Sequence, residues 1–384
     1  MKNKSCLKIF ILVFTMACSK APDSNEGLKY ANVSFDKENE SIKMSDMVTS
    51  VNYIPLITSD DVLINEINKV IHNGEFIYVA DRSSLYKFSF DGVFICKIQK
   101  NGSGPDEYLS ITDFQIDTDG LPWILSRSNK KLMNYSWDGE VTASFELDTW
   151  VNAIYLMNDN RMILYCGNET DNNEYRLNTI DLKTKETENS FLGIDTHKAT
   201  YLHVRTANHF FSFQNKILFY EAFNDTIYSI EKNDISPYLY LNIDNKNIPP
   251  SFYENDYTDI ADFFQNLFTH TYGYGINLFF ENENKYIASY YYDKECYLNI
   301  TEKENAYRYN IKTIHDDIAL YNYPINFTGL TFFPDNCGLL IVVYPTEIMD
   351  YANENLSKEE CANIKEKIKY LSEDQNPLII VLTM

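Results

Sequence analysis

The stretches LYKFSFDG (residues 85–92) and LMNYSWDG (residues 132–139) are two copies of one pattern, 47 residues apart. In each copy bulky residues alternate with polar ones and end in Asp-Gly, and an apolar run follows at once, VFICKI after the first copy and VTASFEL after the second. Alternation predicts a half-buried strand, and Asp-Gly between two such runs is the strongest short signal for a tight hairpin. Each copy is therefore predicted to fold as a strand, a tight turn and a second strand.

Looser copies of this hairpin continue along the chain, at residues 177–192, 226–243 and 296–311. Further strand candidates have a common apolar pattern and lie at residues 75–81, 121–127, 161–167, 216–222, 285–292 and 338–345. A unit of about 40–50 residues with several strands is the signature of a β-propeller. Counting the six strand candidates predicts an all-β fold, a six-bladed β-propeller. The share of aromatic residues, 15%, also favours strands.

Three segments depart from the repeat. Residues 249–270 are predicted to be a short helical insertion. Residues 357–371 are predicted to be a helix, with a capping box formed by Ser357 and Glu360 and an apolar stripe that runs from Cys361 through Ile364 and Ile368 to Leu371. The last residues, LIIVLTM (378–384), form a wholly apolar strand. We expect it to close the ring beside residues 42–56, because closure removes exposed strand edges.

The first residues have the composition of an export signal. Three lysines precede the apolar run IFILVFTM (9–16), which is too short to span a bilayer. It leads to TMAC (15–18), which resembles the lipobox of bacterial lipoproteins, with Thr15 in place of the usual leucine. The prediction is a signal peptide at 1–17, a lipidated Cys18 that anchors the protein, a flexible tether at 18–41 and a single propeller domain at 42–384. The alternative is a plain secretory signal with an incidental cysteine.

The charge of the chain argues against one class of partner. The formal net charge is −22, and removal of residues 1–17 would make it three units more negative. A body this acidic repels nucleic acid, so no nucleic-acid binding is predicted. The cysteines beyond Cys18 show no CxxC spacing and are expected to be mostly small buried residues, although one disulfide is possible.

Several motifs together resemble a known family. GSGPDEY (102–108), FNDTIYSI (223–230) and EDQNPLIIVL (373–382), with the lipobox, are similar to elements of the six-bladed β-propeller lipoproteins of anaerobic gut bacteria, which are distantly like NHL-repeat propellers. This resemblance implies a propeller lipoprotein of the cell envelope, at the outer membrane, on its periplasmic or its surface face. It implies no particular activity.

The glycine-rich loop at 102–108 invites a phosphate-binding interpretation, which the residues after it do not support. A phosphate loop leads into a helix, usually with a Gly-Lys-Ser/Thr sequence, whereas YLSITDFQID here alternates as a strand. We predict a structural role in the crossing from the first to the second blade. Gly102 and Gly104 are expected at positive φ, Pro105 is expected to fix the exit, and Glu107 and Tyr108 are expected to pin the loop.

No motif predicts a catalytic residue, a metal site or a cofactor. DTDG (117–120) lacks the further acidic ligands of a calcium loop and is predicted to be a polar hairpin turn. The spacing of His197, His203 and His209 fits neither one strand face nor the HExxH helix pattern. The chain has six arginines and no sialidase turns, and it lacks the G-x-S-x-G elbow of serine hydrolases.

The sequence therefore favours a non-enzymatic function. The leading hypothesis is a membrane-anchored binding or scaffold module for an envelope protein, a peptide or a glycan, with its site at the channel end and the inter-blade loops. Aromatic residues such as those of SYYYDKE (289–295) could stack on sugar rings, or could pack between blades. The alternative is a calcium-dependent lactonase or hydrolase-like propeller with its site at the channel mouth.

Overall fold

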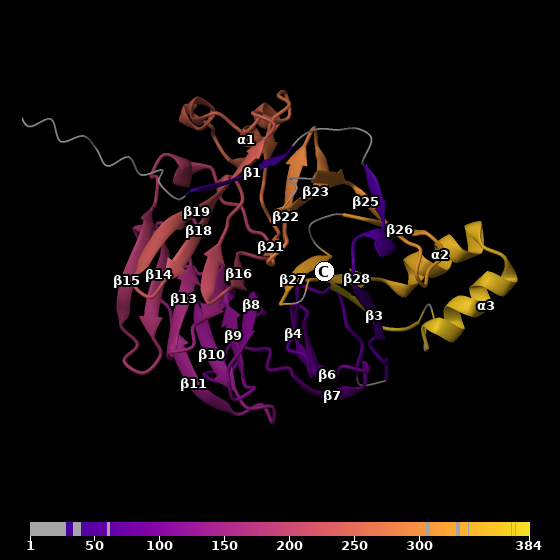
Figure 1. Ribbon diagram of the computed structural model, residues 1–384. Coiled ribbons are helices and arrows are strands. Elements are labelled where there is room, and N and C mark those ends of the chain that lie inside the picture. Colours follow the sequence, from indigo (N-terminus) through magenta and orange to yellow (C-terminus); the bar gives the residue numbers. More distant parts are fainter. Residues whose placement is uncertain are drawn as a thin grey trace, which may run out of the picture.

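Antiparallel sheets follow one another around the whole molecule (Figure 1). The structure is a computed structural model that describes residues 28–33, 40–59, 62–304, 308–327, 331–336, 338–369, 371–372 and 374–384. Within most sheets the strands that pair are consecutive in the chain, so each sheet is one blade of a β-propeller. The all-β propeller predicted from the hairpin repeat is confirmed.

The first three blades each consist of four consecutive antiparallel strands. Blade 1 contains β4 (Lys69–His72), β5 (Phe76–Ala80), β6 (Leu85–Ser89) and β7 (Phe94–Ile98). Blade 2 contains β8 (Asp113–Ile116), β9 (Pro122–Ser126), β10 (Lys131–Tyr135) and β11 (Val141–Glu146). Blade 3 contains β12 (Ala153–Leu156), β13 (Arg161–Tyr165), β14 (Tyr175–Asp181) and β15 (Thr187–Gly193). The Asp-Gly turns of blades 1 and 2 place Gly92 and Gly139 at positive φ, as tight hairpin turns require.

Blades 4 and 5 have a fifth strand each. Blade 4 contains β16 (Phe210–Phe213), β17 (Lys216–Phe219), β18 (Thr226–Glu231), β19 (Asp234–Ile243) and, parallel to β19 at the edge, β1 (Lys29–Val33). Blade 5 contains β20 (Gly273–Tyr274), β21 (Phe279–Glu281), β22 (Lys285–Tyr292), β23 (Glu295–Glu302) and β24 (Arg308–Ile311).

The strand β1 corrects one prediction. Residues 29–33 were expected to belong to a flexible tether, but they pair with β19 along their whole length. Ala31 and Val33 are buried, so this short segment covers the edge of blade 4 with an apolar face. Five residues with weak alternation gave too little pattern to be recognised as a strand.

Blade 7 closes the ring with strands from both ends of the domain. It contains β27 (Phe332–Asp335), β28 (Gly338–Val343), β29 (Leu378–Thr383) and β3 (Ser50–Pro55), and β29 pairs with β3 in antiparallel register. The predicted pairing of the final apolar strand with residues 42–56 is confirmed. Ile379 of β29 belongs to one buried apolar cluster with Leu340 of β28 and Ile77 of β5, so the seam is also packed against blade 1.

The prediction of six blades is wrong, because the structure has seven. Blade 6 has three strands, β2 (Ser41–Lys43), β25 (Thr313–Asp316) and β26 (Tyr323–Asn326). It lies between the outer parts of blades 5 and 7, where β2 contacts β24 and the hydroxyl of Tyr53 donates to the carboxylate of Asp316 at 2.8 Å. Nearer the centre, β21 of blade 5 contacts β27 of blade 7 directly. The strands of this reduced blade are too short to match the repeat, which is why the sequence pattern missed it.

The helices lie at the periphery of the blades (Figure 1). The insertion is confirmed as a 3-10 turn, Pro250–Glu254, and α1 (Ile260–Leu267). The second predicted helix is α3 (Lys358–Lys367), which begins with the predicted Ser357–Glu360 capping box and buries Ile364. The helix α2 (Pro345–Asn355) was not predicted. Short 3-10 turns also lie at Met44–Asp46, Arg127–Asn129 and Lys198–Thr200. None of the helices in the described ranges is long and apolar enough to cross a membrane.

Candidate functional site

Two crossings between blades lie on the same face of the propeller. In a blade of four antiparallel strands, the turn from the second to the third strand and the crossing to the next blade leave from the same end of the sheet. Residues 99–112 cross from β7 to β8, and residues 194–209 cross from β15 to β16. The first crossing holds the predicted glycine-rich loop, and the second lies beside a pocket.

The glycine-rich loop is closed by its own hydrogen bonds. The backbone N–H of Gly104 donates to the carboxylate of Glu107 at 2.8 Å. Tyr108 is buried, and its hydroxyl donates to the carbonyl of Ser83 at 2.9 Å. The ammonium of Lys131 donates to the carbonyl of Gly104 at 2.6 Å and is also within hydrogen-bond distance of two further loop carbonyls. The polar groups of this loop therefore satisfy one another through hydrogen bonds.

The reason for the glycines differs from the prediction. Neither Gly102 nor Gly104 has a positive φ. A Cβ atom at Gly102 would lie 1.9 Å from a carboxylate oxygen of Glu107, and one at Gly104 would lie 3.0 Å from it. Both glycines are thus required for the close approach of Glu107, and Pro105 follows them with its carbonyl 3.2 Å from the Lys131 ammonium. The predicted lipidation residue, Cys18, lies outside the described residues.

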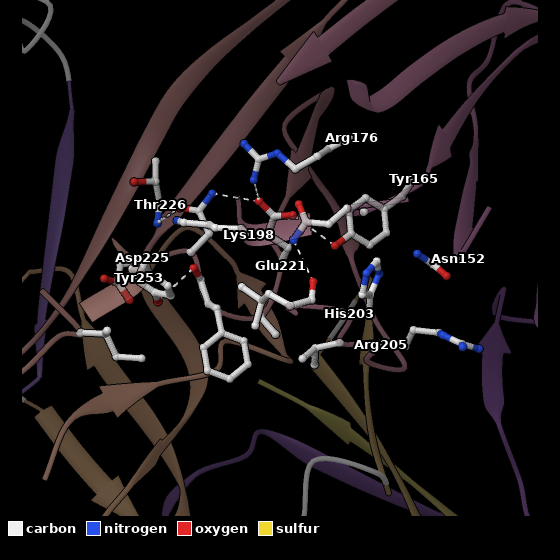
Figure 2. Close-up of a pocket in the computed structure, with 18 of the residues that line it drawn as sticks. Asn152, Tyr165, Arg176, Lys198, His203, Arg205, Glu221, Asp225, Thr226 and Tyr253 are labelled. Atoms are coloured by element: carbon white, nitrogen blue, oxygen red, sulfur yellow. Dashed lines mark hydrogen bonds and ion pairs between the residues drawn. The ribbon is translucent and has the colours of Figure 1, made fainter. Parts of the chain in front are cut away.

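A pocket of about 370 Å3 opens beside the 194–209 crossing. Its walls come from the turn after β13, from this crossing, from the turn between β17 and β18, and from the segment before α1. Figure 2 shows the side chains that line it. The charged or titratable groups among them include Arg176, Lys198, His203, Arg205, Glu221 and Asp225.

Glu221 is the buried polar centre of the pocket, with 4% of its surface exposed. Its carboxylate accepts from the guanidinium of Arg176, from the side-chain amide of Asn224 at 3.0 Å and from the hydroxyl of Tyr165 at 3.1 Å. Burial, and next the charge of Glu221, raise the pKa of Tyr165 well above its ordinary value. Nε of Arg176 is buried and has no hydrogen-bond partner within the described part of the chain. This cluster is therefore fixed, but one of its donors is left unsatisfied.

Two cations of the pocket have no carboxylate partner among the residues that the structure describes. The ammonium of Lys198 lies 4.0 Å from the ring centroid of Tyr253, and burial lowers the pKa of this lysine. Arg205 is exposed at the mouth. Neither side chain forms an ion pair with any residue that the structure describes. Both cations are thus available to an anionic group.

Asp225 is an acidic residue of the same pocket. Burial raises its pKa from 3.8 to about 6, although a hydrogen bond from Asn247 and the charge of Lys198 act in the opposite direction. Glu169, by contrast, is paired with Arg127, whose guanidinium lies 2.6 Å from its carboxylate. Three of the six arginines of this acidic chain, at positions 127, 176 and 205, therefore lie in or beside the pocket.

The other sequence motifs lie elsewhere or have structural contacts. Residues 117–120 form the predicted turn, closed by a hydrogen bond from Gly120 N to Asp117 O at 3.0 Å. Within SYYYDKE, Tyr290 is buried and stacks on Tyr297, which is packing inside the blade. Tyr291 stacks on Tyr274.

No metal or disulfide site emerges from the described residues. Cys96, Cys166, Cys296 and Cys361 are free thiols. Among the residues that the structure describes, no group of three or more His, Cys, Asp or Glu side chains is placed to hold a metal ion. Of the three evenly spaced histidines, His203 lines the pocket, whereas His209 is buried and burial lowers its pKa to about 4.

Sequence reasoning missed the pocket, although one signal was available. In the sequence, FNDTIYSI indicates only a resemblance to a family element, but Phe223, Asn224, Asp225 and Thr226 all line the pocket. These four residues lie where a turn leads into a strand, on the same face as the two crossings, and could have been proposed as a site. Lys198 and Arg205 had no such signal, because they lie in an irregular crossing.

Comparison with known proteins gives a family and a fold. The model of a family described as a domain of unknown function (DUF4934) matches residues 30–383. A solved structure of a Bacteroides fragilis protein predicted to be exported is similar with a TM-score of 0.70 and 15% identity, over 93% of this chain and 100% of that one. A DUF4221 family member from Bacteroides vulgatus has a TM-score of 0.49 and 10% identity, over 88% of this chain and 98% of that one. No curated protein matches the sequence. The likeness to the Bacteroides fragilis protein supports the β-propeller fold.

Proposed function

We propose that this chain, which belongs to the DUF4934 family, is an exported and membrane-anchored binding protein without enzymatic activity, and that it captures its ligand in the pocket between blades 3 and 4. The partner would be a glycan, a peptide or another protein of the cell envelope. The single observation that carries this proposal is that one pocket of a strongly acidic chain holds Lys198, over the ring of Tyr253, and Arg205, neither of which forms an ion pair with a described residue.

The geometry supports binding through rigid walls. The pocket lies on loops that are held by blades 3 and 4, and a β-sheet scaffold with variable loops is a common arrangement for binding. Tyr253 forms one aromatic wall, and its hydroxyl donates to the carbonyl of Phe223 at 3.4 Å. Lys198 lies over this ring, so a ligand could contact the cation and the aromatic surface together.

The calcium-dependent lactonase alternative has no specific observation in its favour. It required carboxylates from several blades to converge on one ion, and the described residues contain no such group. The carboxylate of Glu221 is already occupied by Arg176, Asn224 and Tyr165. The binding proposal requires no rearrangement of these side chains.

Equilibrium binding tests the proposal. Isothermal titration calorimetry would compare neutral and acidic oligosaccharides and peptides on the mature chain, on Lys198→Ala and on a matched control, Lys365→Ala, which removes an exposed lysine from α3. We expect an acidic ligand to bind, with a loss of about tenfold or more for Lys198→Ala and no change for the control. The proposal would be overturned if the protein hydrolysed a lactone and bound none of these ligands. It would also be overturned if Lys198→Ala bound the ligand as tightly as the wild type.

The membrane anchor is a separate part of the proposal and rests on TMAC at residues 15–18. Metabolic labelling with an alkyne-bearing fatty acid should label the wild-type protein at the envelope and leave Cys18→Ala unlabelled. Equal labelling of both chains would contradict lipidation at this cysteine, and release of unlabelled wild-type protein would favour the plain secretory signal.

A further inference from the structure

A second, largely apolar cavity of about 320 Å3 adjoins the pocket. Val204, Arg205, Ala222 and Phe223 line both cavities, so the two meet along these residues. We call the second cavity the aromatic groove, because its walls include Phe264, Phe268, Tyr274 and Tyr291. The groove continues from the charged pocket toward the helical insertion.

Phe223 marks the boundary between the two cavities. Its backbone has a φ of +61°, which is a costly conformation for a residue with a bulky side chain. The ring is held in place by a stack on Tyr274 at a centroid distance of 5.5 Å and by an edge contact with Phe264 at 5.7 Å. The ring of Phe223 is therefore fixed at a place where a ligand that occupies both cavities would contact it.

The charges along the two cavities are arranged around apolar surface. Arg205 lines both cavities, and Lys198 lines the pocket alone. Lys294 lines the groove, with its ammonium 5.7 Å from the ring centroid of Phe268. Phe268 itself is 43% exposed, so part of its ring surface is open to a ligand in the groove.

We propose that the pocket and the aromatic groove together bind one amphiphilic organic anion, with its carboxylate at Arg205, where the two cavities meet, and its apolar part running past Phe223 into the groove. This inference rests on the proposed binding function of the pocket. A single anionic group suits the site better than a polyanion, because the chain as a whole carries a net charge of −22 and would repel an extended one.

The chemistry of the two parts is complementary to such a ligand. A carboxylate would gain charge-assisted hydrogen bonds from donors that have no carboxylate partner among the described residues. An alkyl or aryl part would remove the exposed ring of Phe268 from water, which stabilises the complex in proportion to the apolar area buried. A neutral sugar would lack the first gain, and an inorganic anion would lack the second.

The test is a calorimetric series on the mature chain. Straight-chain carboxylates from acetate to decanoate, and 4-phenylbutanoate, are compared with their neutral amides. We expect affinity to rise by up to about fourfold for each added methylene until the groove is filled. Each amide should bind at least about tenfold more weakly than its acid.

Variants separate the two halves of the site. Arg205→Ala should reduce the preference for acid over amide. Phe268→Ser, at a position that is 43% exposed, should flatten the dependence on chain length and leave acetate binding unchanged. Lys365→Ala serves as the control for loss of charge.

The outcomes distinguish this inference from the proposed function. If acetate binds but longer acids gain nothing, the amphiphilic ligand is wrong and the pocket remains a binding site. If no anion binds, both proposals fail. A further arm compares an acetylated peptide that ends in Phe with its C-terminal amide, so that a free acid and a peptide C-terminus are told apart as sources. Equal binding of acid and amide in both arms would overturn the inference.

Discussion

The crossings 99–112 (the closed crossing) and 194–209 (the open crossing) occupy equivalent positions on one face of the propeller, but they differ in whether their polar groups have partners. In the first, Glu107 accepts from Gly104, and Lys131 donates to loop carbonyls. In the second, Lys198 and Arg205 form no ion pair with a described residue. Polar groups that satisfy one another stabilise the architecture, whereas desolvated groups without a partner cost stability unless a ligand supplies one. Removal of these polar groups should therefore lower the free energy of unfolding at the first crossing, and should leave it nearly unchanged or raise it in or beside the second.

Removal of the tyrosine ring from the closed crossing should have the largest effect. Tyr108 is fully buried, and its hydroxyl donates to the carbonyls of Ser83 and Ile98. Tyr108→Ala should lower the free energy of unfolding by about 3–5 kcal/mol, through the cavity and the lost hydrogen bonds. Denaturant unfolding followed by circular dichroism measures this loss.

Tyr108→Phe separates the two causes in that prediction. It keeps the ring and removes only the hydroxyl, so the expected cost is about 1–2 kcal/mol. A loss below about 1 kcal/mol for Tyr108→Ala would mean that the loop is not a structural element, and the contrast between the two crossings would fail.

The fold was largely predictable because hairpins and ring closure are local or paired patterns. The Asp-Gly turns and the apolar strand 378–384 each carry a strong signal, and β29 pairs with β3 as expected. Blade 6 was not predictable, because β25 and β26 are four residues long and their third strand, β2, comes from a distant part of the chain. The strand β1 was missed for the same reason, since its parallel pairing with β19 depends on tertiary contact alone.

The second prediction concerns Asp225, which lies in the turn between β17 and β18 and lines the same pocket as the 194–209 crossing, and it has the opposite sign. The pKa of Asp225 is raised from 3.8 to about 6, chiefly by burial. Between these pH values the folded protein holds a proton that the unfolded chain has lost, so this group's contribution to stability falls as the pH rises through that interval. Above pH 6 the penalty is complete, at about 2 kcal/mol once partial solvent screening is allowed for. Asp225→Asn should therefore be more stable than wild type by about this amount at pH 7.5, and equal to it near pH 4.

Paired unfolding curves of wild type and Asp225→Asn at the two pH values measure this difference. The comparison cancels other groups that titrate nearby, such as His209, whose lowered pKa acts in the opposite direction. An Asp225→Asn protein that is less stable at pH 7.5 would show that Lys198 stabilises the carboxylate more than burial disfavours it.

The third prediction tests the close approach inside the closed crossing. Gly102→Ala would place its Cβ 1.9 Å from the present position of a Glu107 oxygen, so the carboxylate must move away from Gly104. The expected loss of stability is about 1–2 kcal/mol. In an Glu107→Ala background the same substitution should cost almost nothing, and the double-mutant cycle measures this coupling. Equal costs in both backgrounds would mean that the glycine has another role.

The pocket was less predictable than the fold because its residues come from separate, irregular segments. The turn that contains Asp225 stood out in the sequence, but nothing in the spacing placed it beside Lys198 or Arg205, which lie in the previous crossing. Such a site depends on how blades 3 and 4 pack together. Composition gave one indirect hint, since six arginines in a chain of net charge −22 are few enough for their positions to be informative.

The smallest expected effect is that of a cation removed from the open crossing. Arg205→Ala should change the free energy of unfolding by no more than about 0.5 kcal/mol, because the side chain is exposed and has no ion pair among the described residues. Lys131→Ala removes from β10 an ammonium that donates to the carbonyls of Gly104, Pro105 and Glu107 in the 99–112 crossing, and should cost about 1–2 kcal/mol. Denaturant unfolding of the two variants under one condition gives the comparison directly. Equal losses would show that Arg205 supports the fold, and its role in binding would then have to be argued from ligand titration alone.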